Sequence, residues 1–155
     1  MQPRNHNDFT NHSFKQKNMA TTDNNKAIVA RFNKAFIEGG DTAVFNEIIA
    51  PDFINQTAPD GVPKGPEGVL HFFNHFLKPS FPDLKVEIIS QVAEDDKVTT
   101  HKKFYATHTA DFMGIPATGK KVIMEVMDII RLKDGQFKEH WNVVDWQNIL
   151  QQLNN

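Results

Sequence analysis

The sequence predicts one α+β domain, a cone in which a curved antiparallel sheet wraps around N-terminal helices and encloses a pocket. Apolar residues recur at helical spacing in the first half of the chain, and from residue 84 onward they alternate with polar residues as in strands. Helices that precede an antiparallel sheet pack on one face of it. A chain of 155 residues has the usual size of one domain and is long enough to bury a core.

Composition and charge exclude several kinds of partner. A formal net charge of -2 with both signs interspersed provides no basic surface for phosphates, so we expect no nucleic-acid partner. The absence of cysteine excludes disulfides and thiolate chemistry. No apolar run approaches the roughly 20 residues that cross a bilayer, and the N-terminal residues lack the apolar region of a signal peptide. We therefore expect no membrane association and, by default, a cytoplasmic protein.

Residues 1–23 are polar and rich in Asn, His, Lys and Thr, so they are interpreted as an N-terminal extension. Met19, followed by Ala20, is a candidate alternative translation start. Residues 24–155 are expected to form the single domain.

Three helices are expected in the first half of the domain. The first spans 24–38 and stops at Gly39 and Gly40. The second is capped by Asp41 and ends before Pro51. The third begins at Pro66 and is closed by Pro79 and Pro82. Their apolar faces are predicted to contain Ile28, Phe32, Ala35 and Phe36; Val44, Phe45, Ile48 and Ile49; and Val69, Phe72, Phe73, Phe76 and Leu77.

Four strands follow, and one tight turn fixes the pairing of the last two. The Asp134-Gly135 dipeptide predicts a two-residue hairpin turn, because such turns require positive φ angles. The strands are predicted at 84–93, 98–108, 122–132 and 136–146. With Lys133 opposite Gln136, the regular register places Ile130 opposite Glu139, Asp128 opposite Trp141, Val126 opposite Val143 and Met124 opposite Asp145.

Asp128 is the most informative candidate for a catalytic residue. One strand face consists of Val122, Met124, Val126, Asp128, Ile130 and Leu132, so a single carboxyl group interrupts five apolar side chains. A buried carboxyl group is paired, hydrogen-bonded or raised in pKa. A raised pKa would suit Asp128 as a general base. The alternative is a structural pair with Arg31, a nearby lysine or backbone donors.

Asp145 is the second candidate acid, because the regular register turns it to the same interior as Trp141. Asp128 and Asp145 would then lie roughly 13 Å apart along the ladder, at ~3.3 Å per residue, so they do not form a dyad. Trp141 would supply an aromatic pocket surface between them or simply pack in the core. Asp145 has the alternative role of capping the segment that follows it.

The sequence predicts no metal site and no cofactor. His71 and His75 have the i, i+4 spacing of a helical metal pair, but they fall on the polar face of the third helix. No third ligand has useful spacing, and no glycine-rich phosphate loop is present.

Several short motifs occur together in an order that resembles the SnoaL-like polyketide cyclase (ester cyclase) family. The resemblance covers 24–153 and implies the nuclear transport factor 2-like cone, homo-oligomers and, as in the family's cyclases, cofactor-free aldol closure of a polyketide ester. The motifs are Ala50-Pro-Asp-Phe-Ile-Asn55, Gly65-Pro-Glu-Gly, Phe81-Pro-Asp83, Thr107-His-Thr, Met113-Gly-Ile-Pro-Ala-Thr-Gly-Lys120, Asp128-Ile-Ile-Arg131, Asp134-Gly135 and His140-Trp141 through Asp145.

The resemblance also implies pocket residues. Asn55 matches a pocket asparagine of the cyclases, whereas Asp128 occupies the position of their pocket histidine. An ungapped count from the hairpin places Asn142 where the cyclases have their catalytic aspartate, and Asp145 matches a downstream aspartate of wider family members. We also place His108, from the Thr107-His-Thr motif, among the expected pocket residues.

The leading hypothesis is a cofactor-independent enzyme that acts on a small hydrophobic carbonyl or ester substrate. Asp128 or Asp145 would remove a proton from the carbon next to a carbonyl group. Asn55 and neighbouring donors would stabilise the resulting enolate. The rival is a noncatalytic domain that binds a small molecule in the same cone. The outer sheet face, with Ile123, Met127 and Ile129, is suited to a second copy, so a homodimer is expected.

Overall fold

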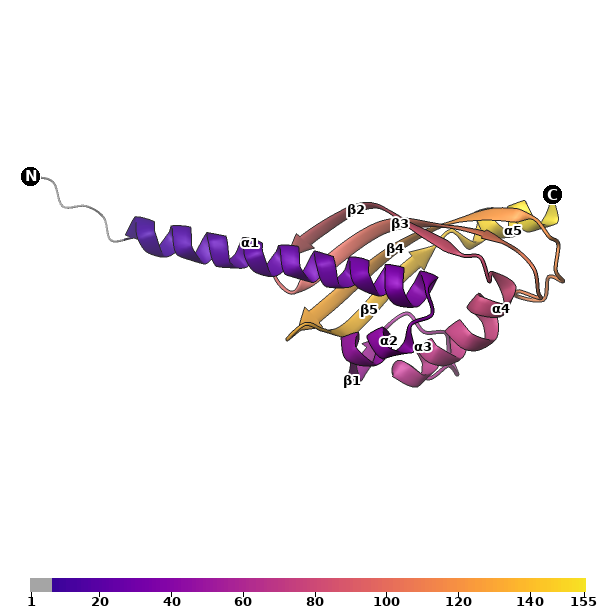
Figure 1. Cartoon of the computed structure of the whole chain (residues 1–155), viewed down its shortest axis with the longest axis horizontal. Coiled ribbons are helices and arrows are strands. Elements are labelled where there is room, and N and C mark those ends of the chain that lie inside the picture. Colours follow the sequence, from indigo (N-terminus) through magenta and orange to yellow (C-terminus); the bar gives the residue numbers. More distant parts are fainter. Residues whose placement is uncertain (1–6) are drawn as a thin grey trace, which may run out of the picture.

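The computed structural model describes residues 7–155, which form a curved five-stranded sheet with helices on its concave face (Figure 1). The predicted α+β fold class is confirmed. The elements are α1 (Asn7–Phe32), the π-helical turn η1 (Asn33–Glu38), α2 (Thr42–Ile48), β1 (Ile49–Asn55), α3 (Pro66–Phe72), the π-helical turn η2 (Phe73–Leu77), α4 (Lys78–Ser80), β2 (Lys85–Glu94), β3 (Lys97–Thr107), β4 (Lys121–Lys133), β5 (Gln136–Val144) and α5 (Trp146–Asn154).

The strand order is β1-β5-β4-β3-β2, in which β1 pairs parallel to β5 and the other neighbours are antiparallel. The four strands predicted from alternation are present, with ends displaced by one or two residues. The strand β1, which follows α2 directly and contains Pro51, was not predicted from the sequence. A proline cannot donate to a ladder and is tolerated at a sheet edge, which is where β1 lies.

The first helix is longer than predicted. Its backbone is helical from Asn7, whereas the apolar stripe predicted a start at Asn24. Once the amphipathic part is formed, each added residue gains a backbone hydrogen bond without a new nucleation cost, and no Gly or Pro interrupts residues 7–24. The first six residues of the expected extension lie outside the described residues.

Two π-helical turns change which side chains the helices bury. In the third predicted helix, Phe73 and Leu77 are buried as expected, but Phe72 and Phe76 are 42% and 45% exposed. The wider η2 turn breaks the 3.6-residue period on which the predicted face depended. The first of these turns, η1, begins at Asn33, which is also buried.

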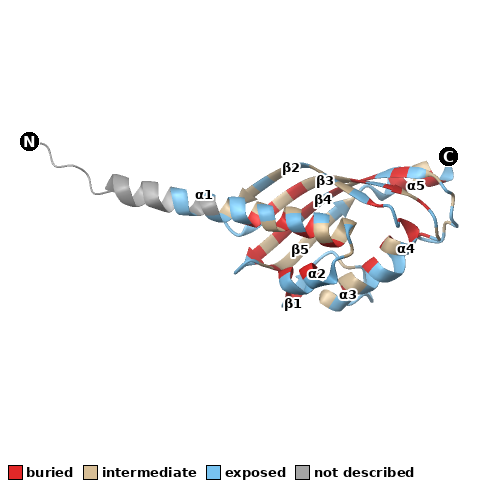
Figure 2. Cartoon of the chain, viewed as in Figure 1, coloured by how far each residue is buried: buried red, intermediate tan, exposed pale blue. Residues whose placement is uncertain are grey.

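Aromatic rings join the helices to the sheet. The ring of Phe36 lies 4.8 Å from that of Phe45 and 4.3 Å from that of Phe73, so α2 and η2 meet on it. Phe32 contacts Phe137 of β5 at 4.9 Å. These contacts form one contiguous core between the two layers, and Figure 2 shows buried segments on both the helices and the strands.

A bulge in β5 alters the predicted register. Asp134 and Gly135 both have positive φ angles, and Lys133 pairs with Gln136 as predicted. The pairing then shifts, because Leu132 is opposite Phe137 but Arg131 is opposite Glu139, so Lys138 is the extra residue. From this point the predicted register is wrong by one residue, which turns the side chains of β5 to the opposite faces. The observed pairs are Ile130 with His140, Ile129 with Trp141, Asp128 with Asn142, Met127 with Val143 and Val126 with Val144.

Glu38 connects the helical layer to the edge strand β2. Its carboxylate accepts a hydrogen bond from the backbone N–H of Val86 at 3.0 Å and contacts the ammonium groups of Lys34 at 2.5 Å and Lys85 at 3.2 Å. The side chain is only 8% exposed. The bonds from Lys34 and Val86 outweigh the effect of burial and lower the pKa of Glu38 to about 2.

Glu38→Gln is expected to destabilise the protein by about 2 kcal/mol at neutral pH, because hydrogen bonds to a charged acceptor are lost. Since the pKa of Glu38 is lower in the folded state, its contribution is complete above pH ~4.5 and is lost as the pH falls toward ~2. Denaturant unfolding between pH 7 and pH 3 should therefore show a weaker acid dependence for the variant. Glu47→Gln, which removes the exposed pair with Arg31, is the control with a much smaller effect. Equal effects of the two substitutions would contradict the assignment.

Candidate functional site

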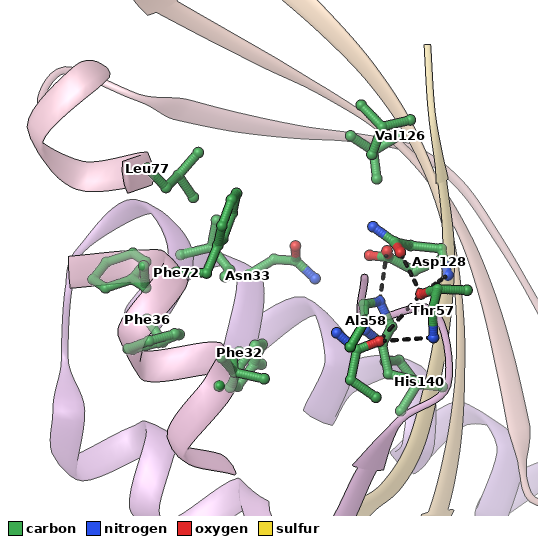
Figure 3. A pocket seen from close by; sticks show the side chains of 18 of the residues that line it. Phe32, Asn33, Phe36, Thr57, Ala58, Phe72, Leu77, Val126, Asp128 and His140 are labelled. Carbon is green, nitrogen blue, oxygen red and sulfur yellow. Dashed lines mark hydrogen bonds and ion pairs between the residues drawn. The ribbon is translucent and has the colours of Figure 1, made fainter. Parts of the chain in front are cut away.

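A cavity of about 390 Å³ lies between the helices and the concave face of the sheet. Its walls are mainly apolar and aromatic, and its size is that of a small-molecule site. Figure 3 shows Phe32, Phe36 and Phe72 on the helical side, with Asp128, His140 and Thr57 grouped on the sheet side. The polar residues that line the cavity are Asn33, Asn55, Thr57, Lys102, Asp128, His140 and Asn142.

A buried ion pair between Asp128 of β4 and Lys102 of β3 lies in the sheet wall. Each of the two side chains is only 7% exposed. The predicted buried face of β4 is confirmed, since all six of its members are buried. Lys102 also donates a hydrogen bond to Oδ1 of Asn33 at 2.7 Å, and its ammonium lies 5.1 Å from the centre of the Phe104 ring. The pair therefore connects the sheet to the π-helical turn η1.

Lys102 was missed in the sequence analysis, although its signal was present. It lies on the same β3 face as buried Val98, Thr100, Phe104 and Ala106. A lysine among such residues is as unusual as an aspartate in the adjacent apolar face, and a buried charge requires a partner. Because β3 pairs directly with β4, the buried lysine Lys102 and the buried aspartate Asp128 lie next to each other.

The pKa of Asp128 is lowered, not raised as expected for a general base. Burial alone would raise it, but the charge of Lys102 and the hydrogen bond from His140 together outweigh burial and lower it to about 2. Asp128 is therefore a carboxylate at neutral pH. This direction is opposite to the raised pKa that would suit Asp128 as a general base, and the ion pair with Lys102 is the structural alternative of a pair with a lysine. Arg31, the other partner considered, pairs with Glu47.

His140 is the pocket residue that the regular register concealed. The bulge at Lys138 turns His140 of β5 into the cavity, where its Nε2 lies 3.0 Å from Oδ1 of Asp128 (Figure 3). Because a carboxylate can only accept, Nε2 carries the proton of this bond. A neutral His140 then has its lone pair on Nδ1, and Asp128 holds the ring in that tautomer. The arrangement provides a proton acceptor oriented by an adjacent carboxylate.

A second polar group lies beside His140 and consists of Asn55, Thr57 and Asn142. Thr57 Oγ1 is 3.1 Å from Oδ1 of Asn55 and 2.6 Å from Oδ1 of Asn142. The parallel pairing of β1 with β5 places Asn55 directly opposite His140. Asn55 and Asn142, both expected in the pocket, line the cavity together with His140.

Three other predicted site residues lie away from the cavity. Asp145 is exposed and caps α5, accepting from the backbone N–H of Asn148 at 3.1 Å. Trp141 lies opposite Ile129 on the other sheet face, because the bulge reverses its direction. His108 is fully buried beside Phe81, with a ring nitrogen bonded to Thr118, and it does not line the cavity. The sequence motif that suggested His108 thus marks a buried loop connection.

Among the residues whose side chains the structure describes (16, 17, 19 and 21–155), no group of three or more histidine, cysteine or acidic side chains is arranged to hold a metal ion. His71 and His75 stack on the exposed face of their helix, with ring centres 4.4 Å apart. In the same part of the chain, no helix is both long enough and apolar enough to cross a membrane.

The fold and the cavity define a class, the nuclear transport factor 2-like α+β cones with a pocket between helices and sheet. Among solved structures, IdmH from Streptomyces antibioticus, a proposed polyketide cyclase, has a TM-score of 0.74 and 30% sequence identity over 84% of this chain and 99% of its own. AclR from Streptomyces galilaeus, a proposed hydroxylase, has a TM-score of 0.76 and 26% identity over 86% of this chain and 82% of its own.

Residues 27–153 match the family model described as SnoaL-like polyketide cyclase, and the chain belongs to this family. The resemblance inferred from the motifs is therefore confirmed. The nogalonic acid methyl ester cyclase of Streptomyces nogalater is 24% identical over 115 residues, which cover 74% of this chain and 86% of the cyclase. An aklanonic acid methyl ester cyclase of Streptomyces peucetius is 27% identical over 129 residues, 81% of this chain and 88% of its own.

Asp128→Asn is expected to lower the free energy of unfolding by about 3 kcal/mol or more, because Lys102 would remain buried without its counter-charge. Adding Lys102→Met to this variant should restore much of the loss, since the unpaired charge is then removed. A double-mutant cycle by denaturant unfolding measures both effects. Asp52→Asn, at the exposed pair with Lys138, is the control and should change stability little. A stable single Asp128→Asn variant would contradict the ion-pair assignment.

Proposed function

We propose that this protein is a cofactor-independent enzyme of the polyketide cyclase type, in which His140 acts as the general base on a small hydrophobic ester or ketone. The observation that carries the proposal is the hydrogen bond from His140 to Asp128 in the wall of an apolar cavity. Asp128 takes the role of orienting His140, in place of the base role expected from the sequence.

The proposed reaction is an intramolecular aldol closure. Nδ1 of His140 takes a proton from the carbon next to a carbonyl group, and the electron pair of the broken C–H bond forms an enolate. Side-chain N–H groups of Asn55 and Asn142 are placed to donate to the enolate oxygen. The enolate carbon then bonds to a second carbonyl carbon of the same molecule. The resulting alkoxide takes the proton back from the imidazolium, so the base is regenerated and atoms balance.

The charges of the cavity favour an uncharged substrate. Lys102 and Asp128 are the only lysine, arginine or acidic residues among the described residues that line it, and they neutralise each other. No cation is left to pair with a carboxylate or phosphate of a ligand, and burying an unpaired anion there would be costly. The names of the curated relatives, which are methyl ester cyclases, agree with a substrate whose acid is esterified.

The rival function is noncatalytic binding of the same kind of molecule. It is favoured because two residues of the family's cyclases are replaced in this chain. Asp128 occupies the position of their pocket histidine, and Asn142 occupies the position of their catalytic aspartate. A binding domain would use the same aromatic walls but would release its ligand unchanged.

We also propose that two copies associate through the outer face of the sheet. Apolar side chains on this face are exposed, among them Ile123 at 45%, Met127 at 50% and Val143 at 72%. Pairing places Met127 between His101 of β3 and Val143 of β5, so these side chains are neighbours. A sheet face that exposes several large apolar side chains is typical of an interface.

Met127→Lys is expected to shift the protein from dimer toward monomer, because a buried ammonium in the interface lacks a partner. Light scattering after size-exclusion chromatography measures the mass. Met113→Lys changes a 58% exposed methionine outside the sheet and should leave the mass unchanged. A wild-type protein of monomer mass would refute the proposed association.

His140→Gln is expected to slow proton exchange at the carbon between the carbonyls of an aromatic β-keto methyl ester by about 100-fold or more, because the general base is lost. NMR in D2O follows the exchange. His101→Gln is the matched control, since His101 also pairs with a carboxylate, Glu125 at 2.6 Å, but on the outer sheet face. Unchanged exchange in His140→Gln would refute the base assignment. Saturable binding by the wild type without exchange would favour the binding domain.

A further inference from the structure

We infer that Thr57 is a positioning residue that turns the side-chain amides of Asn55 and Asn142 so that their N–H groups form a receptor for a carbonyl oxygen beside His140. This inference rests on the proposed function for its catalytic consequence, but the receptor itself would bind a neutral carbonyl ligand in either an enzyme or a binding domain. Thr57 lies in the turn after β1 and lines the cavity (Figure 3).

The orientation of the Asn55 amide follows from a backbone donor. The N–H of Thr57 lies 3.2 Å from Oδ1 of Asn55. A backbone N–H can only donate, so the oxygen of this amide must face Thr57 and its NH2 group must point elsewhere.

The Thr57 hydroxyl fixes the Asn142 amide in the same way. Its Oγ1 accepts a hydrogen bond from the backbone N–H of Asn142 at 3.2 Å, so its own proton is free for an acceptor. That acceptor is Oδ1 of Asn142 at 2.6 Å, which is nearer than Oδ1 of Asn55 at 3.1 Å. Thr57 therefore satisfies both amide oxygens, one through its backbone and one through its hydroxyl.

The two NH2 groups are left for a ligand. Among the described residues, neither Nδ2 of Asn55 nor Nδ2 of Asn142 has a hydrogen-bond partner, and neither atom is enclosed by protein. Both residues line the cavity. A carbonyl oxygen, which accepts two hydrogen bonds, is the complement of two such donors.

The receptor lies next to His140. Asn55 is the direct partner of His140 across β1 and β5, and Asn142 is two residues further along β5 on the same face, about 6.6 Å away at ~3.3 Å per residue. A carbonyl oxygen bound by the two amides thus places its neighbouring carbon beside the imidazole. An enolate formed there would keep the same two hydrogen bonds and strengthen them.

The turn that carries Thr57 is held against β5. The backbone N–H of Gln56 donates to the carbonyl of His140 at 2.8 Å, and that of Asn55 donates to the carbonyl of Lys64 at 2.7 Å. These bonds fix the hydroxyl of Thr57 relative to both amides before a ligand binds, which is the preorganisation that a receptor of this kind requires.

The test compares the full-length wild type with Thr57→Val and Thr57→Ser. Valine has the shape of threonine without the hydroxyl, and serine keeps the hydroxyl. The probes are 2-acetylnaphthalene and 2-ethylnaphthalene, which differ in the carbonyl group. We expect the wild type and Thr57→Ser to bind the ketone at least fivefold more tightly than the hydrocarbon, with shifts of the Asn55 and Asn142 side-chain NH2 signals in NMR. Thr57→Val should lose this preference and these shifts.

The catalytic readout is separate from the binding readout. Thr57→Val should lower kcat for the β-keto ester exchange by about tenfold or more, with an unchanged shape of the pH profile, because His140 is intact. No preference for the ketone in the wild type, or a preference kept in Thr57→Val, would overturn the inference. If the ketone preference depends on Thr57 but the wild type catalyses no proton exchange, the receptor is supported and the proposed enzyme is refuted.

Discussion

The buried pair between Lys102 and Asp128 is the constraint on which the rest of the site depends. Two charges removed from water are stable only when each is compensated and its remaining hydrogen bonds are made. Here Asn33 of the helical layer accepts a hydrogen bond from Lys102, and His140 of β5 is hydrogen-bonded to Asp128. The need to satisfy one charge pair therefore sets the position of four side chains from four elements, and it keeps the polar part of an otherwise aromatic cavity in one place.

Irregular backbone places these side chains. The π-helical turn η1 begins at Asn33, and the bulge at Lys138 turns His140 inward. Both features weaken the regular hydrogen-bond pattern of their element, and such features occur frequently at functional sites. In this chain they lie on opposite walls of the same cavity, and the Lys102–Asp128 pair bridges them.

The sequence predicted the fold class, the first three helices, the long strands and the buried position of Asp128, because these depend on the periodicity of apolar residues. The prediction failed where one extra residue, Lys138, interrupts the alternation of side chains along β5. Nothing in Phe137-Lys-Glu-His140 marks an extra residue, since charged and aromatic side chains are found on both faces of a strand, so Trp141 and Asp145 were assigned to the pocket in place of His140. The sequence left the direction of the Asp128 pKa shift open, because that direction depends on a lysine of the partner strand. The alternation of β3 places Lys102 on the buried face, but this signal was not used.

The cavity has two walls that differ in their tolerance of change. On the sheet side, a substitution at Lys102 or Asp128 leaves an uncompensated charge in the interior. On the opposite side, Phe72 and Val62 line the cavity while 42% and 37% exposed, so replacing them leaves no uncompensated charge and removes less buried area than replacing a core residue. The rim can therefore change one residue at a time and admit ligands of new shape, whereas a change in the polar centre requires Lys102 and Asp128 to be replaced together. A protein built in this way acquires new substrates more readily than it acquires a new chemistry.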